Sequence, residues 1–370
     1  MPLIPRRAML GLLAGSSLIG RRDPLLRGAT RPPPPHLETR ATYGVMPTEI
    51  FEAGRTLADY GINTVFLNSR LVTTERLELL RRHGARVYAE FNTMHDAESL
   101  KQHPDAAPIG ADGQVSPPPD GWQGVCPTHA GYRRHRLNAF RSLLAAHAID
   151  GVWLDYHHAH ASWEQAVPNM PDTCFCTRCL AQFATDTGTR LPKAPTPAIA
   201  QSLLGEHADR WIQWRCGVFT DWVRELRDIS RRVRPAALLG TFHNPWSDAD
   251  FDGARSRKLA IDLKGQAPYL DVFSPMPYHA RFGHAGDPGW ISRQVAWLGQ
   301  YLGVSGRPGE RHRIWPIVQI SDWGAPVPVS QVGAVLEHAS RAPATGTIVF
   351  SWGSFRKEQE KIEALRQAWA

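Results

Sequence analysis

The feature that most constrains the fold is a regular alternation, after residue 40, of short apolar runs and amphipathic stretches. The runs are nearly continuous in apolar residues and end in polar ones, which is typical of strands buried on both faces of a parallel sheet. Eight such strands alternating with about as many helices predict an α/β fold, a (β/α)8 TIM barrel. The expected strands are Ala41–Met46, Ile62–Asn68, Arg86–Asn92, Ile149–His157, Ala237–Asn244, Leu270–Tyr278, Ile314–Ser321 and Thr347–Trp352.

The stretches between the runs carry apolar residues at helical spacing. The longest, 208–233, places Trp211, Trp214 and Trp222 on one face and ends before Pro235. The alternative is an open doubly wound sheet, which usually begins with a Gly-rich phosphate turn after its first strand. Here Pro47-Thr48-Glu49 follows the first run, so the sequence favours the barrel.

Residues 1–39 are expected to form an export signal and a Pro-rich linker, and residues 40–370 to form the barrel domain. Arg6-Arg7 precedes a modestly apolar run, Ala8–Gly20, which is too short to span a bilayer. The order resembles a twin-arginine signal and predicts a periplasmic or secreted protein. The other interpretation is a disordered basic tail. No later segment is apolar and long enough for a membrane helix, so we expect no stable membrane insertion after signal removal.

The charge of the chain is concentrated in the same N-terminal segment. Residues 1–40 hold seven Arg and two acidic residues, and so carry +5 of the formal net charge of +7. The remainder is close to neutral, so the sequence does not indicate a nucleic-acid partner, which needs a basic stripe on the folded domain. It indicates no oligomeric state.

A barrel of this kind places its functional site on the loops after the strands. The loops expected after strands three and four, 93–130 and 158–195, are unusually long, and loops of this length are usually functional or disordered. Three carboxylates stand at strand ends: Glu90, Asp155 and Asp322. Because glycoside cleavage needs one carboxylic acid and one carboxylate, we predict these three as catalytic candidates, with Asp155 first.

Other polar and aromatic residues at the strand ends are candidates for binding substrate. Aromatic rings pack on the apolar faces of sugars, and amide or imidazole groups bond their hydroxyls. The expected substrate-binding residues are Asn68, Asn92, His157, His243, Tyr278, Trp323 and Trp352.

Four cysteines form a candidate metal site. Cys174, Cys176 and Cys179 have the spacing C-x-C-x-x-C in one loop, and Cys126 lies in the preceding long loop. Four thiolates would complete a tetrahedral structural zinc site. Disulfides, which export permits, and unpaired thiols remain alternatives, with Cys216 as the odd cysteine. No organic cofactor is expected.

The motif-bearing part of the chain, 125–183, resembles the family catalogued as hypothetical glycosyl hydrolase group six. The resemblance rests on Val125-Cys126-Pro127, on the strand Ile149-Asp150-Gly151-Val152-Trp153-Leu154-Asp155, and on the cysteine loop followed by Phe183. It implies a barrel with a carbohydrate-related role, near beta-galactosidases that carry a cysteine-bound zinc, and it maps the strand-four aspartate onto Asp155. Thr128 departs from the family pattern, and the strand-four and strand-seven Glu of retaining barrel glycosidases are not evident.

Three functions follow as hypotheses. The first is an exported enzyme that cleaves a poly- or oligosaccharide, with Asp155 as nucleophile or electrostatic stabiliser and Glu90 or Asp322 as general acid. The second is a non-catalytic carbohydrate-binding barrel. The third is a metal-dependent hydrolase that uses His157, His243 and Asp155.

Overall fold

The computed structural model describes residues 37–370, so almost all of the predicted export segment lies outside the described residues. The centre is one parallel sheet in the order β7-β6-β5-β4-β3-β2-β1-β9-β8. The strands are β1 (Thr39–Gly44), β2 (Thr64–Asn68), β3 (Arg86–Asn92), β4 (Gly151–Asp155), β5 (Leu238–His243), β6 (Val272–Pro275), β7 (Arg313–Ile314), β8 (Ile317–Gln319) and β9 (Gly346–Phe350).

The two strands at the ends of this order belong to one stretch of chain, 313–319. Pro316 has no N–H to give to the ladder, and the stretch is assigned as two short strands on either side of Trp315 and Pro316. Its first half pairs with β6 and its second half with β9. The sheet therefore curls until its ends meet, and the α/β, barrel-like architecture predicted from the sequence is confirmed.

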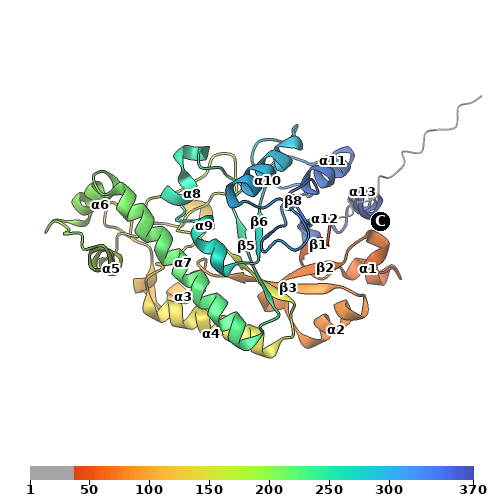
Figure 1. The fold of residues 1–370 in the computed structure, drawn as a ribbon, viewed down its shortest axis with the longest axis horizontal. Helices are drawn as coiled ribbons and strands as arrows, with labels where there is room; N and C mark the ends of the chain where they lie inside the picture. Colours follow the sequence, from red (N-terminus) through yellow and green to blue (C-terminus); the bar gives the residue numbers. More distant parts are fainter. Residues whose placement is uncertain (1–36) are drawn as a thin grey trace, which may run out of the picture. The chain divides into compact units, whose positions relative to one another are not determined.

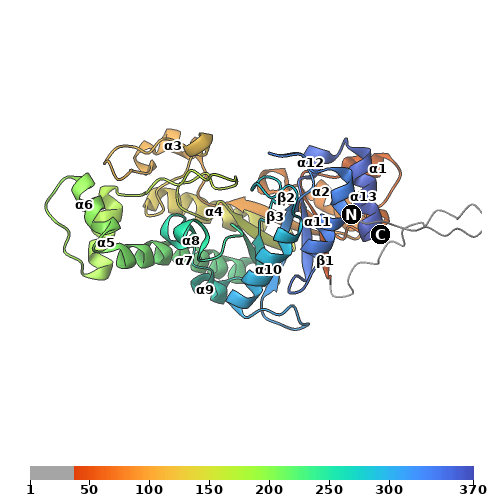
Figure 2. The ribbon, with the colours of Figure 1, turned by 90° about the horizontal axis from the view of Figure 1, so that it is seen from above.

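Helices cover the outside of the sheet (Figure 1). They are α1 (Thr48–Glu52), α2 (Thr74–Arg82), α3 (Ala97–Gln102), α4 (Ala130–Ala146), α5 (Thr177–Thr187), α6 (Thr196–Leu204), α7 (Ala208–Val233), α8 (Ala254–Arg257), α9 (Leu263–Gln266), α10 (Gly289–Leu302), α11 (Val329–Ala339), α12 (Trp352–Phe355) and α13 (Gln359–Trp369). Figure 2 shows α5 and α6 at the end of α7 that lies away from the strands. Within 37–370, none of the helices has the length and apolar character needed to cross a bilayer.

Large aromatic side chains fill the interior of the curled sheet. The rings of Trp153 and Trp315 stack with centroids 5.3 Å apart, and Phe66 and Tyr88 pack against Trp153 at 4.9 and 4.6 Å. The Trp153 indole also donates a hydrogen bond to Ser274. Because these partners come from strands all around the sheet, they form an internal plug.

Side chains alternate between the two faces of a strand, so a residue two positions after a plug residue also points into the interior. Asp155 follows Trp153 by two residues and Glu90 follows Tyr88 by two, so both carboxyl groups point into the interior. They lie toward the carboxyl ends of the strands, where barrel enzymes have their active sites.

Most predicted strands differ from the observed ones by one to three residues at an end, and three differences stand out. Strand seven was expected as one run, Ile314–Ser321, and is split at Trp315-Pro316. The last strand ends at Phe350, and Trp352 instead begins helix α12. Strand four ends at Asp155, because Tyr156 has a left-handed backbone with φ of 49°.

We predict that Gly240→Ala destabilises the fold by about 3 kcal/mol or more, the cost of overpacking a filled core. A Cβ at Gly240 would stand 2.3 Å from the Trp153 ring, which has no free space to move into. Chemical denaturation followed by circular dichroism measures this loss.

Gly217→Ala is the matched control, because its Cβ meets nothing within 4 Å and it lies within α7. Replacing an exposed helical Gly by Ala should stabilise the protein by up to about 1 kcal/mol. Equal effects of the two substitutions would contradict the tightly filled interior.

Candidate active site

Glu90 and Asp155 form a pair of buried carboxyl groups on neighbouring strands. Glu90 on β3 lies beside Trp153 in the register, and Asp155 is the next inward residue of β4. Their exposed fractions are 4% and 8%. Asp155 and Glu90 interact electrostatically, which places two of the three predicted catalytic residues at one site.

The pair is held by neutral hydrogen-bond donors. Asn68 Nδ2 donates to Glu90 Oε2 at 2.6 Å, and the Tyr43 hydroxyl donates to the same oxygen at 3.3 Å. The backbone N–H of Tyr156 donates to Asp155 Oδ1 at 2.9 Å. Among the described residues, neither carboxyl group forms an ion pair with Lys, Arg or His.

Burial raises the pKa of both carboxyl groups. Burial and then the charge of Glu90 hold the pKa of Asp155 well above its ordinary value. Burial also raises the pKa of Glu90, and the bonds from Asn68 and Tyr43 and the charges of Arg70 and Arg136 oppose that shift. Two adjacent carboxyl groups cannot both ionise cheaply, so we infer that the pair shares one proton and carries one negative charge.

Aromatic side chains surround the pair. Tyr43 packs on Phe242 and Phe350 with centroids 5.6 and 5.5 Å apart, and Tyr278 packs on Phe350 at 4.9 Å. Trp323 continues the group, 5.3 Å from Phe350. The Tyr278 hydroxyl is buried and has no hydrogen-bond partner among the described residues. The predicted binding residues Tyr278 and Trp323 therefore lie together in this aromatic group.

Glu164, which the sequence analysis missed, joins the site from the loop after β4. It interacts electrostatically with Asp155, Tyr156 and Tyr278, and burial raises its pKa to about 7. A single Glu inside a long irregular loop belongs to no periodic pattern, so no local signal in the sequence marks it.

Asp322, the third predicted catalytic residue, lies in the loop after β8 and is paired with a cation. Lys361 Nζ is 2.7 Å from its carboxylate, and the backbone N–H of Val327 donates to the same oxygen. The bond from Lys361 lowers the pKa of Asp322, whose side chain is 52% exposed. An ionised carboxylate of this kind is poorly suited to donate a proton, because the proton is already lost at neutral pH.

Three other predicted binding residues have structural partners instead. Both ring nitrogens of His157 are occupied, by the Thr93 hydroxyl and the Phe219 carbonyl. Asn92 Oδ1 accepts the backbone N–H of His95. Trp352 is fully buried and donates to Glu49. Asp155 and His157 were predicted to point the same way along one strand. The left-handed backbone at Tyr156 ends the strand between them, so this prediction does not hold.

The catalytic metal trio of the third hypothesis is not assembled. His243 Nδ1 bonds the carbonyl of Asn244, and its Nε2 is buried without a partner. In the described part of the chain, the groups close enough to share a metal are the four cysteines and a second set, His103, Asp105 and His129. The trio His157, His243 and Asp155 is not among them.

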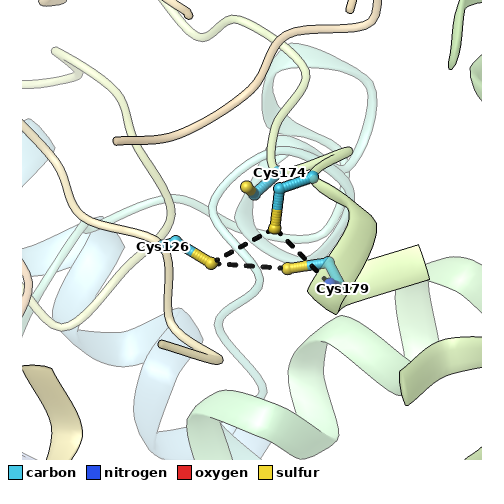
Figure 3. Close-up of side chains that lie close together, drawn as sticks. Cys126, Cys174 and Cys179 are labelled. Carbon is cyan, nitrogen blue, oxygen red and sulfur yellow. Dashed lines mark hydrogen bonds between the residues drawn. The ribbon is translucent and has the colours of Figure 1, made fainter. Parts of the chain in front are cut away.

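The four cysteines converge between the two long loops, as Figure 3 shows for three of them. Cys126 Sγ is 3.6 Å from the sulfur atoms of both Cys176 and Cys179. All the cysteines are free thiols and buried. A tetrahedral ion with bonds of about 2.3 Å would hold its sulfur ligands roughly 3.8 Å apart, so the cluster has the geometry to bind a metal.

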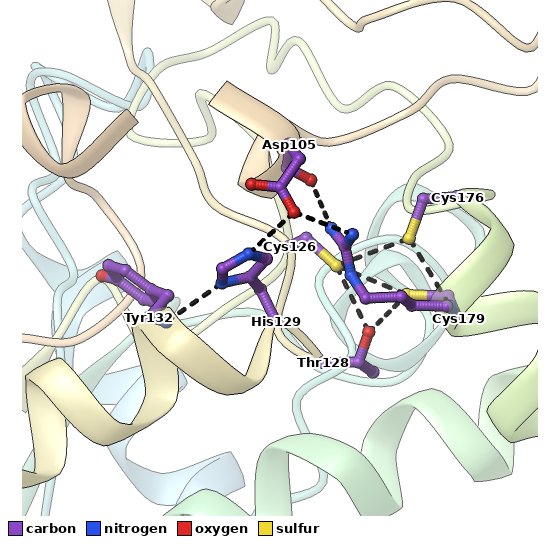
Figure 4. A network of polar contacts seen from close by, with 8 residues as sticks. Asp105, Cys126, Thr128, His129, Tyr132, Cys176 and Cys179 are labelled. Atoms are coloured by element: carbon purple, nitrogen blue, oxygen red, sulfur yellow. Dashed lines mark hydrogen bonds and ion pairs between the residues drawn. The ribbon is translucent and has the colours of Figure 1, made fainter. Parts of the chain in front are cut away.

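A polar network beside the cluster fixes the loop after β3 (Figure 4). His129 Nδ1 accepts the backbone N–H of Tyr132 at the start of α4, and its Nε2 bonds Asp105. Asp105 is also paired with Arg178 of α5. Because both nitrogens of His129 are used, the second set is a helix cap and loop anchor.

The comparisons with known proteins find likeness in structure alone. No family model and no curated protein matches the chain. Many solved structures match, at identities too low to show more than the fold.

Three of these structures illustrate the range. The glycoside hydrolase domain of PgaB (BpsB) from Bordetella bronchiseptica matches with a TM-score of 0.66 and 14% identity, over 90% of this chain and 99% of that one. A beta-galactosidase from Halorubrum lacusprofundi gives 0.60 and 15%, over 85% and 53%. An alpha-L-fucosidase from Paenibacillus thiaminolyticus gives 0.55 and 11%, over 89% and 48%. This chain spans about half the length of the latter two, and it shares its fold with glycoside hydrolase domains.

Proposed function

We propose that this protein hydrolyses a glycosidic bond of a poly- or oligosaccharide at the site formed by Glu90, Asp155 and Glu164. The observation that carries the proposal is the buried Glu90–Asp155 pair, which lies inside the curled sheet and has no ion-pair partner among the described residues. Burying carboxyl groups in this way costs stability, and such groups cluster at functional sites. The fold shared with glycoside hydrolase domains supports the same chemistry.

The pair would act on the positive charge that develops at the sugar. Glycosidic cleavage passes through an oxocarbenium-like state, and a carboxylate next to the anomeric carbon stabilises that charge. One negative charge shared by Glu90 and Asp155 provides this stabilisation. Its attraction to the positive charge on the sugar is stronger in a buried site than in water. Asp155 is the nucleophile or electrostatic stabiliser in this scheme, and Glu90 shares the proton and the negative charge of the pair with it.

The aromatic group would bind the sugar. Tyr43, Tyr278 and Trp323 offer apolar ring faces together with hydroxyl or indole groups, a combination that suits carbohydrate. The Tyr278 hydroxyl, which has no partner among the described residues, would form a hydrogen bond with a sugar hydroxyl.

Export remains part of the proposal. Arg6-Arg7 and the apolar run that follows them are typical of a twin-arginine signal, and an extracytoplasmic location fits a polysaccharide substrate. Detection of the protein in periplasmic or secreted fractions, and its loss from them after Arg6→Lys with Arg7→Lys, tests this.

We predict that Asp155→Asn lowers kcat by roughly a thousandfold, because removing one electrostatic group aimed at a developing charge costs about two to three orders of magnitude. Reducing-sugar release from a panel of polysaccharides and oligosaccharides measures the loss. Binding of the same sugars by calorimetry should persist, because the aromatic group is intact.

Asp322→Asn is the control, since Asp322 is tied to Lys361 and lies outside the carboxyl cluster. Its kcat should stay within about tenfold of the wild type. A wild-type protein that binds these sugars and cleaves none of them would contradict the enzyme and support a carbohydrate-binding barrel.

We also propose that Cys126, Cys174, Cys176 and Cys179 hold a structural zinc ion. The four sulfur atoms lie within 4.8 Å of one another, and backbone N–H groups of Ile109 and Cys179 donate to two of them. The ion would join the loop after β3 to the loop before α5. It would stabilise the fold and take no part in cleavage.

Elemental analysis of the purified protein should find about one zinc per chain. Cys126→Ser should lose the metal and lower the melting temperature, because a structural ion contributes its binding energy to folding. Cys216→Ser, which changes a buried thiol outside the cluster, should keep the metal. Recovery of disulfides in place of zinc would contradict the proposal.

A further inference from the structure

Glu164 is the least buried of the three carboxyl groups at the site, and it comes from a loop above the other two. Resting on the proposed function, we propose that Glu164 is the proton donor that protonates the departing glycosidic oxygen. The sequence predicts Glu90 or Asp322 for this role, but Asp322 is paired with Lys361, and one oxygen of Glu90 accepts two hydrogen bonds.

Hydrogen bonds on both sides of Glu164 fix the backbone that carries it. Glu164 lies within a turn closed by two backbone hydrogen bonds between Ser162 and Asn169, of 2.9 and 2.8 Å. The preceding Trp163 is buried and donates to His158 at 2.9 Å. Catalytic groups need this kind of support, because a displacement of about 1 Å costs rate.

The other loops at the mouth also fix this turn. Arg281 Nε donates to the carbonyl oxygen of Glu164 at 2.7 Å, and its guanidinium lies 4.7 Å from the centre of the Trp323 ring. Gln319 of β8 accepts the backbone N–H of Arg281 at 3.1 Å. Gln165 reaches Asp120 in the loop after β3. Segments that follow four strands therefore fix the backbone of the turn that carries Glu164.

The surroundings of Glu164 keep it protonated near neutral pH. Asp155, Tyr156 and Tyr278 interact with it electrostatically, and Arg281 is the cation that acts on it. Burial raises the pKa of Glu164 to about 7, and Arg281 only partly opposes this. A donor of this pKa is protonated in a large share of molecules at neutral pH, and it still transfers its proton readily.

Glu90 is less well placed to donate a proton, although burial raises its pKa as well. The Asn68 amide nitrogen and the Tyr43 hydroxyl both donate to Glu90 Oε2, and donors to a carboxylate oxygen favour the ionised form. Glu90 also lies one residue pair deeper than the strand ends, next to Trp153 in the register. It therefore supplies charge below the sugar, while Glu164 supplies the proton from the side of the loops.

The proton moves from the Glu164 carboxyl to the glycosidic oxygen while the bond between that oxygen and the anomeric carbon breaks. The bonding electrons stay on the departing oxygen, which leaves as an alcohol. Water then gives its hydroxyl group to the anomeric carbon, and its remaining proton returns to the carboxylates of the site.

Glu164→Gln tests the assignment through leaving groups. Cleavage of a phenyl glycoside of the released sugar should slow by roughly 100- to 10,000-fold, the usual contribution of a general acid. A dinitrophenyl glycoside of the same sugar should slow by less than about tenfold, because its leaving group departs without a proton. Glu360→Gln, an exposed glutamate of α13, is the matched control and should leave both rates unchanged.

The pH profile gives a second readout. Glu164 donates only while protonated, so wild-type kcat/KM should fall as pH rises through about 7, and this fall should be absent in Glu164→Gln. Carbon-13 NMR of glutamate-labelled protein should find one carboxyl that titrates near pH 7 in the wild type and is missing in the variant. Unchanged circular dichroism of the variant confirms its folding.

The outcomes separate the two proposals. A wild-type protein that cleaves no glycoside overturns the proposed function, and the role of Glu164 falls with it. An active wild type whose Glu164→Gln variant slows equally on both glycosides, or keeps the alkaline fall, overturns the role of Glu164 alone. Selective slowing of the phenyl glycoside in Glu90→Gln, and not in Glu164→Gln, would assign the proton to Glu90.

Discussion

The stack of Trp153 and Trp315 inside the curled sheet is the interaction on which the rest of the structure depends. The glycines at 240 and 346 leave the room for these rings, because a Cβ at either position would collide with one of them. The stacked rings fill the lower interior, so the next inward residues of β3 and β4, Glu90 and Asp155, lie above an apolar floor. The position and burial of the carboxyl pair both follow from this packing.

That floor explains the electrostatics of the site. A carboxyl group above indole rings loses its water, and no Lys or Arg among the described residues forms an ion pair with either group, although Arg70 and Arg136 partly offset the burial of Glu90. The fold accepts this cost, with Asn68 and Tyr43 offsetting part of it through hydrogen bonds. Asp322 illustrates the contrast, since its pairing with Lys361 gives an ordinary ionised carboxylate at the edge of the same face.

The two long loops after β3 and β4 complete the site, and the cysteine cluster ties them together. Cys126 comes from one loop and the other three cysteines from the next, while Asp105 and Arg178 bridge the same two segments. A cluster of this kind limits the motion of loops that lack regular structure. The turn that carries Glu164 belongs to the second of these loops, so its rigidity depends on the same ties.

Features that depend on a regular spacing of residues along the chain could be predicted from the sequence. The alternation of runs predicts the parallel sheet, a spacing of two residues places Asp155 with Trp153 and Glu90 with Tyr88, and the C-x-C-x-x-C spacing marks the cysteine cluster. Only the tertiary structure decided which polar residues share a site. It brought in Glu164, paired Asp322 with a lysine 39 residues away, and turned His157 toward Phe219. These outcomes depend on loop conformation and on contacts between distant segments, which no local pattern encodes.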